Sequence, residues 1–222
     1  MSVFAGHRLT CIRGQRVVFR DLSFEVNAGG LLLLVGANGS GKTSLLRLMA
    51  GLLAPAAGVI CWDGDDVRRD AETFRGVMRY VGHLDAVKPA LTVAEHLRFW
   101  AALQIAPGSP AQPEVTTALE AFGIAHLAEL PGRFLSAGQR RRLALARLLL
   151  VPARLWLLDE PRTALDTAAV ARLDAAIADH RRTGGVVVLS SHAGERPPEA
   201  TVLNLDDFAA AATEAWGWRE AW

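Results

Sequence analysis

The fold class is decided by residues 31–43, which read Leu31-Leu32-Leu33-Leu34-Val35-Gly36-Ala37-Asn38-Gly39-Ser40-Gly41-Lys42-Thr43. The first five form a continuous apolar run, which is typical of a strand buried on both faces of a parallel sheet. The next eight fit the pattern G-x-x-x-x-G-K-[ST]. Glycines let backbone N–H groups surround phosphate oxygens, and the start of a helix adds positive potential there. The stretch therefore predicts a strand, a phosphate-binding loop and a helix from about Lys42 to Leu53.

This loop supplies most of the candidate ligand-binding residues. Lys42 would reach the β- and γ-phosphates of a nucleotide, and the Thr43 hydroxyl would bind Mg²⁺. Only two of the 24 basic residues are lysines, Lys42 and Lys88, so a lysine at this position is informative. A Gly-rich turn with a chance lysine is the alternative, and the flanking strand and helix disfavour it. We expect nucleotide contacts from Gly36, Ala37, Asn38, Gly39, Ser40, Gly41, Lys42, Thr43 and Ser44.

The rest of the chain alternates short apolar runs with helical patterns. Strands are predicted at 17–26, 77–82, 155–158, 186–190 and 201–205, and helices at 91–103, 115–122 and 140–150. This order predicts an α/β fold with a mainly parallel sheet covered on both faces. The segment from 84 to about 139 contains no clear strand. We expect it to be a helical subdomain inserted into one domain that spans residues 1–222.

A second candidate site lies where the apolar run Leu155-Trp156-Leu157-Leu158 ends in Asp159-Glu160. Strand C-termini of a parallel sheet face the ligand crevice. Asp159 is therefore the candidate Mg²⁺ ligand, and Glu160 the candidate general base that polarises the attacking water. The alternative is a solvated acidic turn, which the nearby phosphate-binding loop disfavours.

The segment Leu135-Ser136-Ala137-Gly138-Gln139 precedes a helix. A serine with small residues at a helix start can bind an anion. Ser136 can equally serve as an ordinary N-cap. The residues alone leave both interpretations open.

In order, these motifs resemble the ATP-binding cassette (ABC) ATPases, with a P-loop NTPase core. The matching residues are 36–43, 135–139, 155–161, 164–166 and His192. The resemblance implies ATP and Mg²⁺ as ligands and a head-to-tail pair of cassettes. Ser136, Gly138 and Gln139 of one cassette would then complete the site on its partner. The resemblance also implies that Asp166 lies in the loop that links the two nucleotide sites. It implies, too, that His192 is catalytic and contacts the γ-phosphate.

Two positions depart from the family pattern. Arg13 stands where the family usually places an aromatic residue against adenine, and a guanidinium can stack there by cation–π attraction. An exposed surface arginine is the alternative. His83 stands where the family has a glutamine that ligates Mg²⁺. Because imidazole prefers softer metals, we expect His83 to position or sense rather than ligate; a loop histidine at an interface is the alternative.

Further motifs resemble one subfamily, the ATP-binding subunits of the bacterial cytochrome c maturation system, or haem exporter. They are Tyr80-Val81-Gly82-His83, Leu91-Thr92-Val93-Ala94-Glu95 and 135–142. The resemblance implies a peripheral protein on the cytoplasmic face of the cell inner membrane. It would act as a homodimer with integral membrane subunits of the maturation complex. ATP hydrolysis would drive haem export or release of a haem-carrying chaperone.

The composition of the chain excludes some classes of protein and of binding partner. The chain is 51% hydrophobic and 21% charged with a net charge of +1, so disorder and a global basic field for nucleic acid are excluded. We expect Arg140–Arg142 to be a solvated helix face and no nucleic-acid partner. No apolar run reaches the roughly 18–20 residues that span a bilayer. An exporter of a drug, lipid or lipoprotein remains an alternative, as does a soluble ABC ATPase acting on nucleic acid.

Overall fold

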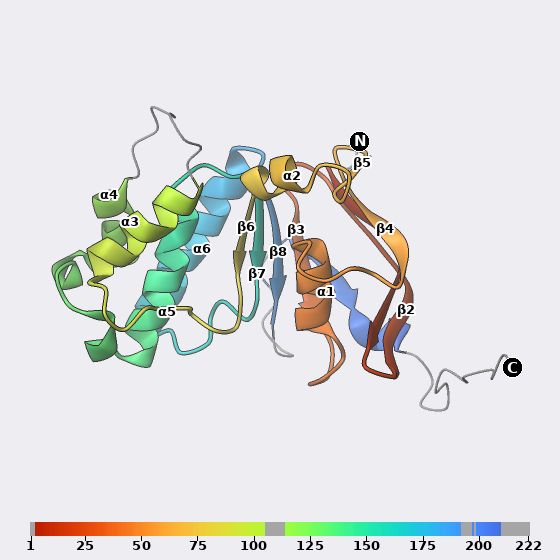
Figure 1. Cartoon of the computed structure of the whole chain (residues 1–222), viewed down its shortest axis with the longest axis horizontal. Helices are drawn as coiled ribbons and strands as arrows, with labels where there is room; N and C mark the ends of the chain where they lie inside the picture. The colour runs from red at the N-terminus through yellow and green to blue at the C-terminus, as the bar shows by residue number, and fades with distance from the viewer. Residues whose placement is uncertain (1–2, 105–113, 192–196, 198, 210–222) are drawn as a thin grey trace, which may run out of the picture.

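The computed structural model describes residues 3–104, 114–191, 197 and 199–209, and its strands form two sheets (Figure 1). A parallel sheet has the order β6-β7-β8-β3-β9. Its strands are β6 (Met78–Val81), β7 (Leu155–Leu158), β8 (Val186–Ser190), β3 (Leu31–Val35) and β9 (Thr201–Asn204). All five correspond to predicted strands, and the inner strands β7, β8 and β3 are the apolar runs expected of buried parallel strands.

Side chains of the parallel strands alternate between two hydrophobic cores. Leu32, Leu34, Leu155 and Leu157 lie in the core on one face. Leu31, Leu33, Trp156 and Leu158 lie in the core on the other. The expected coverage of both faces is therefore confirmed, since β3, β7 and β8 each contribute apolar side chains to both cores.

The predicted strand at residues 17–26 belongs to a separate sheet, not to the parallel one. This antiparallel sheet has the order β2-β1-β4-β5. Its strands are β1 (Phe4–Arg13), β2 (Arg16–Val26), β4 (Ala57–Trp62) and β5 (Asp65–Asp66). Arg13 pairs with Arg16 across a tight turn in which Gly14 has φ +59°. A connection this short joins antiparallel strands only, so β2 cannot continue a parallel sheet.

Helix α1 (Lys42–Met49) packs between the two sheets (Figure 1). It buries Leu45, Leu46, Leu48 and Met49. The predicted extension to Leu53 is wrong, because Gly51 adopts φ +67° and ends the helical path after the Ala50 cap.

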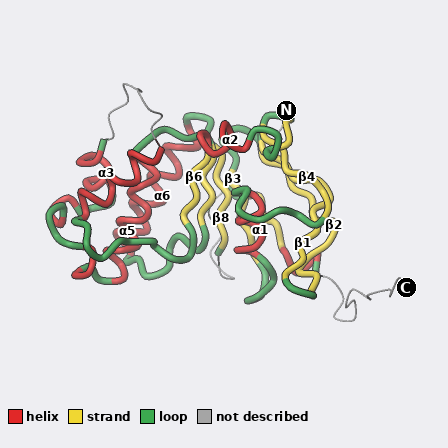
Figure 2. Tube along the Cα trace, in the orientation of Figure 1, coloured by secondary structure: helices red, strands yellow, loops and turns green. Residues whose placement is uncertain are grey.

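The second core lies between the parallel sheet and the helices gathered on one flank of Figure 2. These are α3 (Val93–Gln104), α4 (Val115–Ala121), α5 (Ala137–Ala146) and α6 (Thr167–Arg182). Helix α5 starts before the predicted 140 and gives way to the 3₁₀ helix η3 (Arg147–Leu149). The remaining elements are α2 (Ala71–Val77), η1 (Ala125–Leu127), η2 (Gly132–Phe134) and η4 (Leu205–Phe208).

Helices α3 and α4 contact each other and also α5, which extends beyond residue 139. In the part of the chain that the structure describes, no helix has the length and apolar character needed to cross a bilayer.

Candidate nucleotide-binding site

The phosphate-binding loop borders a cavity of about 340 Å³. It connects β3 to α1, as the sequence predicts. Most of the lining was predicted from sequence; Arg16 and Val18 were not. The lining residues are Arg13, Arg16, Val18, Asn38, Gly39, Gly41, Lys42, Thr43, Ser44 and Glu160.

Two loop glycines are required by backbone geometry. Gly41 adopts φ +106°, and a Cβ there would lie 2.5 Å from Val18 Cγ1. Gly36 adopts φ +142°, and a Cβ there would lie 2.7 Å from Ser40 Oγ. Side chains at these positions would be strained and would clash, so the loop keeps its curvature only with glycine.

Lys42 points its ammonium back into its own loop. Its Nζ donates to Gly36 O at 2.7 Å and to Ala37 O at 3.0 Å. Lys42 is only 6% exposed and pairs with no acidic residue of the described segments. A buried ammonium bonded only to neutral carbonyls leaves its positive charge available to an anion.

The buried carboxylate of Asp159 joins two segments that are far apart in the sequence. Its Oδ2 accepts from Thr43 Oγ1 at 2.9 Å, and its Oδ1 accepts from Ser190 Oγ at 2.8 Å. The two predicted metal-binding residues therefore lie in direct contact. Asp159 is 1% exposed, whereas Thr43 is half-buried at the cavity wall.

Glu160 lies on the cavity wall in an unusual backbone conformation. Its φ is +47°, a region that non-glycine residues occupy at an energetic cost. Its N–H donates to Ser190 Oγ at 2.9 Å. His83 Nδ1 is 3.7 Å from Glu160 Oε2, and the His83 side chain is 61% exposed. The structure thus brings His83 to the candidate general base.

The Ser136 motif and Asp166 lie outside this cavity lining, at helix starts. Gln139 N donates to Ser136 Oγ at 3.2 Å, and Ser136 N donates to Gln139 Oε1 at 2.8 Å. This is a complete capping box at the start of α5. Asp166 caps α6 by accepting from Ala169 N at 2.8 Å. A Cβ on Gly138 would lie 2.8 Å from Ala164 O, so the two helix starts are neighbours. His192 lies outside the described residues.

Two structural features near the site were missed by sequence reasoning. Ala37 N donates to both oxygens of Asp206 at 3.1 Å, which braces the start of the loop. The predicted solvated face at 140–142 is wrong for Arg141, which is 3% exposed. Acceptors from distant loops surround its guanidinium, and a sequence pattern gives no sign of them.

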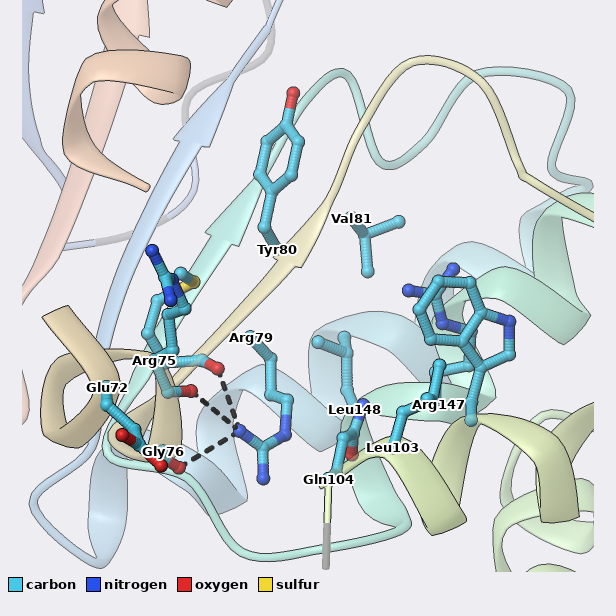
Figure 3. A pocket seen from close by; sticks show the side chains of 12 residues that line it. Glu72, Arg75, Gly76, Arg79, Tyr80, Val81, Leu103, Gln104, Arg147 and Leu148 are labelled. Atoms are coloured by element: carbon cyan, nitrogen blue, oxygen red, sulfur yellow. Dashed lines mark hydrogen bonds between the residues drawn. The ribbon is translucent and has the colours of Figure 1, made fainter. Parts of the chain in front are cut away.

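A second cavity of about 550 Å³ lies beside β6 (Figure 3). Arg79 donates to Gly76 O at 3.0 Å and to Met78 O at 2.8 Å, beside the C-terminus of α2. Arg147 stacks on Trp100, 3.5 Å from its ring centroid. Burial lowers the pKa of Arg147 to about 10. The lining also includes Glu72, Arg75, Tyr80, Val81, Leu103, Gln104 and Leu148.

Comparison with known proteins gives concordant matches. The family model for ABC transporters matches residues 19–163. The "Cytochrome c biogenesis ATP-binding export protein CcmA" of Paramagnetospirillum magneticum is 53% identical over 210 residues, covering 95% of this chain and 97% of that protein. The protein of the same name from Rhodospirillum rubrum is 53% identical over 216 residues, covering 97% of this chain and 91% of that protein.

Solved structures share the fold. A putative ABC transporter ATP-binding protein from Pyrococcus furiosus superposes with a TM-score of 0.78 at 24% identity, covering 93% of this chain and 99% of that one. An ATP-binding subunit of another ABC transporter gives a TM-score of 0.77 at 26% identity, covering 86% and 80%. The chain therefore belongs to the ABC transporter family, as an ATP-binding protein of the group that contains these cytochrome c biogenesis relatives.

Proposed function

We propose that this chain is the ATP-hydrolysing subunit of a membrane exporter complex for cytochrome c biogenesis. The observation that carries the hydrolytic part is the 2.9 Å contact between Thr43 and Asp159 beside the cavity lined by Lys42 and Glu160. The cytochrome c part is supported by relatives at 53% identity that are named for this process.

The residues fit Mg²⁺ as the metal. The Thr43 hydroxyl and the Asp159 carboxylate offer the hard oxygen ligands that Mg²⁺ prefers. Held by Thr43 and Asp159, Mg²⁺ would supply positive charge that offsets the charge of the transferred phosphoryl group.

The chain's own groups then have separate roles in the reaction. Lys42 stabilises charge on the γ-phosphoryl group, and the loop amides orient the phosphates. Glu160 accepts a proton from the attacking water. Arg13, at the cavity edge next to Arg16, stacks on the adenine face. His83 positions Glu160, and His192 contacts the γ-phosphate.

The complete site needs a second copy of the chain. Ser136 and Asp166 are exposed at helix starts outside the cavity lining. In a head-to-tail homodimer, Ser136, Gly138 and Gln139 of one protomer cover the nucleotide of its partner. Helix N-termini favour anions, which suits contact with the γ-phosphate.

The homodimer would act on the cytoplasmic face of the inner membrane with integral membrane subunits of the maturation complex. We propose that the membrane subunits contact this chain at the second cavity beside β6, called the groove below (Figure 3). Its lining has Arg75, Arg79 and Arg147 against one acid, Glu72, so the partner segment should be acidic as well as apolar. The energy would drive haem export or release of a haem-carrying chaperone.

Photo-crosslinking tests the groove placement. Leu103 and Leu52 are both 64% exposed, but only Leu103 lines the groove. A crosslinking amino acid at 103 should capture the co-purified membrane subunit, and one at 52 should not. Equal capture at both positions would place the contact elsewhere.

Hydrolysis and cytochrome assembly test the function itself. The complex should hydrolyse ATP only with Mg²⁺, and Lys42→Ala should abolish turnover. Glu160→Gln should bind ATP and trap a dimer on size-exclusion chromatography. In a strain lacking the gene, the parent chain should restore covalent c-type haem and Lys42→Ala should not. Normal c-type haem without the gene would instead favour an exporter of another substrate.

A further inference from the structure

Arg141, on α5, forms a set of hydrogen bonds that uses its whole guanidinium. Its Nε donates to Pro161 O at 3.2 Å. Its Nη1 donates to Gly82 O at 2.9 Å and to Asp85 Oδ1 at 3.2 Å. Its Nη2 donates to Asp159 O at 2.7 Å and to Glu160 O at 2.8 Å. A guanidinium has five N–H groups, so every donor has an acceptor.

These acceptors belong to two catalytic segments. Asp159, Glu160 and Pro161 follow β7, whereas Gly82 and Asp85 flank His83 after β6. Arg141 itself lies on the helix that Ser136 caps. One buried side chain therefore joins the Ser136 helix to both loops beside the cavity.

The hydrogen bond to Glu160 has a specific consequence. The φ of +47° at Glu160 is costly for a residue with a side chain, and it persists only if its surroundings hold it. Ser190 Oγ accepts from the Glu160 N–H, and Arg141 donates to its carbonyl. The strained residue is thus held at both polar groups of its backbone.

We propose that Arg141 is a positioning residue for ATP hydrolysis, fixing the Glu160 carboxylate for water attack and linking it to the helix that covers the partner's nucleotide. The inference rests on the proposed hydrolytic function. Any displacement of α5 when two protomers close would move Glu160 and the His83 loop together, because all three are attached to one guanidinium.

The planar arrangement of N–H donors in the Arg141 guanidinium matters more for these hydrogen bonds than its positive charge does. Asp85 balances the buried charge at 3.2 Å, but four of the five acceptors are neutral backbone carbonyls. A lysine ammonium has three donors at one point and cannot span carbonyls on two loops. Arg141→Lys should therefore fail to replace the parent residue.

The test compares Arg141→Lys and Arg141→Gln in the full chain with its membrane partners. Misplacing a catalytic group by about 1 Å can lower a rate about 100-fold, so kcat should fall by that order in both variants. ATP affinity, measured with a fluorescent analogue, should stay within about threefold, because Arg141 does not line the nucleotide cavity. Arg182→Gln, which removes a 74% exposed guanidinium from α6, should behave as the parent.

A second readout needs no nucleotide. Amide hydrogen exchange at residues 159–163 should be faster in both Arg141 variants than in the parent, since the loop loses its restraint. Because Arg141→Lys retains the positive charge beside Asp85, it can still be measured by both assays if Arg141→Gln does not fold.

The outcomes separate the two proposals. Parent-like kcat in Arg141→Lys would show that only charge matters and would overturn the positioning role. So would an increase in KM with kcat unchanged, or unaltered exchange at 159–163. A parent complex that does not hydrolyse ATP would contradict the proposed function instead, and the exchange experiment would still test Arg141.

Discussion

Ser190→Ala removes one hydroxyl that contacts both the candidate Mg²⁺ ligand, Asp159, and the candidate general base, Glu160. Ser190 is fully buried at the end of β8, and its Oγ donates to Asp159 Oδ1 at 2.8 Å. The same oxygen accepts from Glu160 N at 2.9 Å. Alanine fits the space but leaves a carboxylate oxygen and a backbone N–H without their partner.

The two bonds set the expected loss of stability. Leaving a buried polar group unsatisfied costs about 1–3 kcal/mol, and a charged acceptor is at the upper end. The substitution should therefore lower the free energy of unfolding by about 2–5 kcal/mol, a large part of the roughly 5–15 kcal/mol of a typical domain. It should also lower kcat more than ATP affinity, because Glu160 loses the restraint on its N–H.

Urea denaturation of the full chain measures the first effect, and steady-state ATP hydrolysis measures the second. Ser23→Ala is the matched control: Ser23 Oγ accepts from Arg8 N at 2.9 Å, but this contact is exposed. Its loss should cost well under about 1 kcal/mol, since water replaces the partner. A Ser190→Ala loss no larger than that of Ser23→Ala would refute the argument.

The remaining predictions concern the contact of Arg13 with adenine, the stability of the protein at acidic pH and the helix cap at Ser136. Arg13→Ala should weaken ATP binding by about 0.5–2 kcal/mol and Arg13→Tyr should restore it, measured by fluorescence titration. The neutral His96 is buried, and burial lowers its pKa to about 4. In the unfolded chain the imidazole of His96 takes up a proton near pH 6.5, whereas in the folded chain it stays neutral until about pH 4. The free energy of unfolding should therefore fall by about 2 kcal/mol between pH 8 and pH 5. In urea titrations, His96→Gln should lose this part of the pH dependence. Ser136→Asp should keep the folded stability of the parent but lose ATP-dependent dimerisation on size-exclusion chromatography.

Much of the nucleotide cavity could be predicted because its signals are local. The spacing from Gly36 to Thr43 and the apolar runs of β3 and β7 each lie within a few residues. A strand followed directly by a phosphate-binding loop fixes where the loop lies in a parallel sheet. Because β3 and β7 both run parallel to β8, which lies between them, Asp159 and the phosphate-binding loop follow strands that end at the same edge of the sheet, where Asp159 contacts Thr43.

The parts that could not be predicted depend on long-range backbone acceptors. Arg141 shares its helix and its residue type with Arg140 and Arg142, so a pattern of charges predicts the same surroundings for all three. Its burial is set by carbonyl oxygens after β6 and β7, and a carbonyl carries no sequence signature. The contact of Asp206 with Ala37 N was missed for the same reason, because it joins positions far apart in the chain.

The two interpretations of Ser136, N-cap and anion ligand, are compatible in this structure. The capping box uses a lone pair of Ser136 Oγ as acceptor for Gln139 N, and leaves the hydroxyl proton free to donate. A phosphate oxygen needs that donor and the nearby amides, whereas folding needs only the acceptor. Aspartate caps a helix about as well as serine but has no proton to donate when ionised, and it adds a negative charge beside the partner's γ-phosphate. The substitution therefore separates the two roles: retained dimerisation in Ser136→Asp would show that Ser136 acts only as a cap.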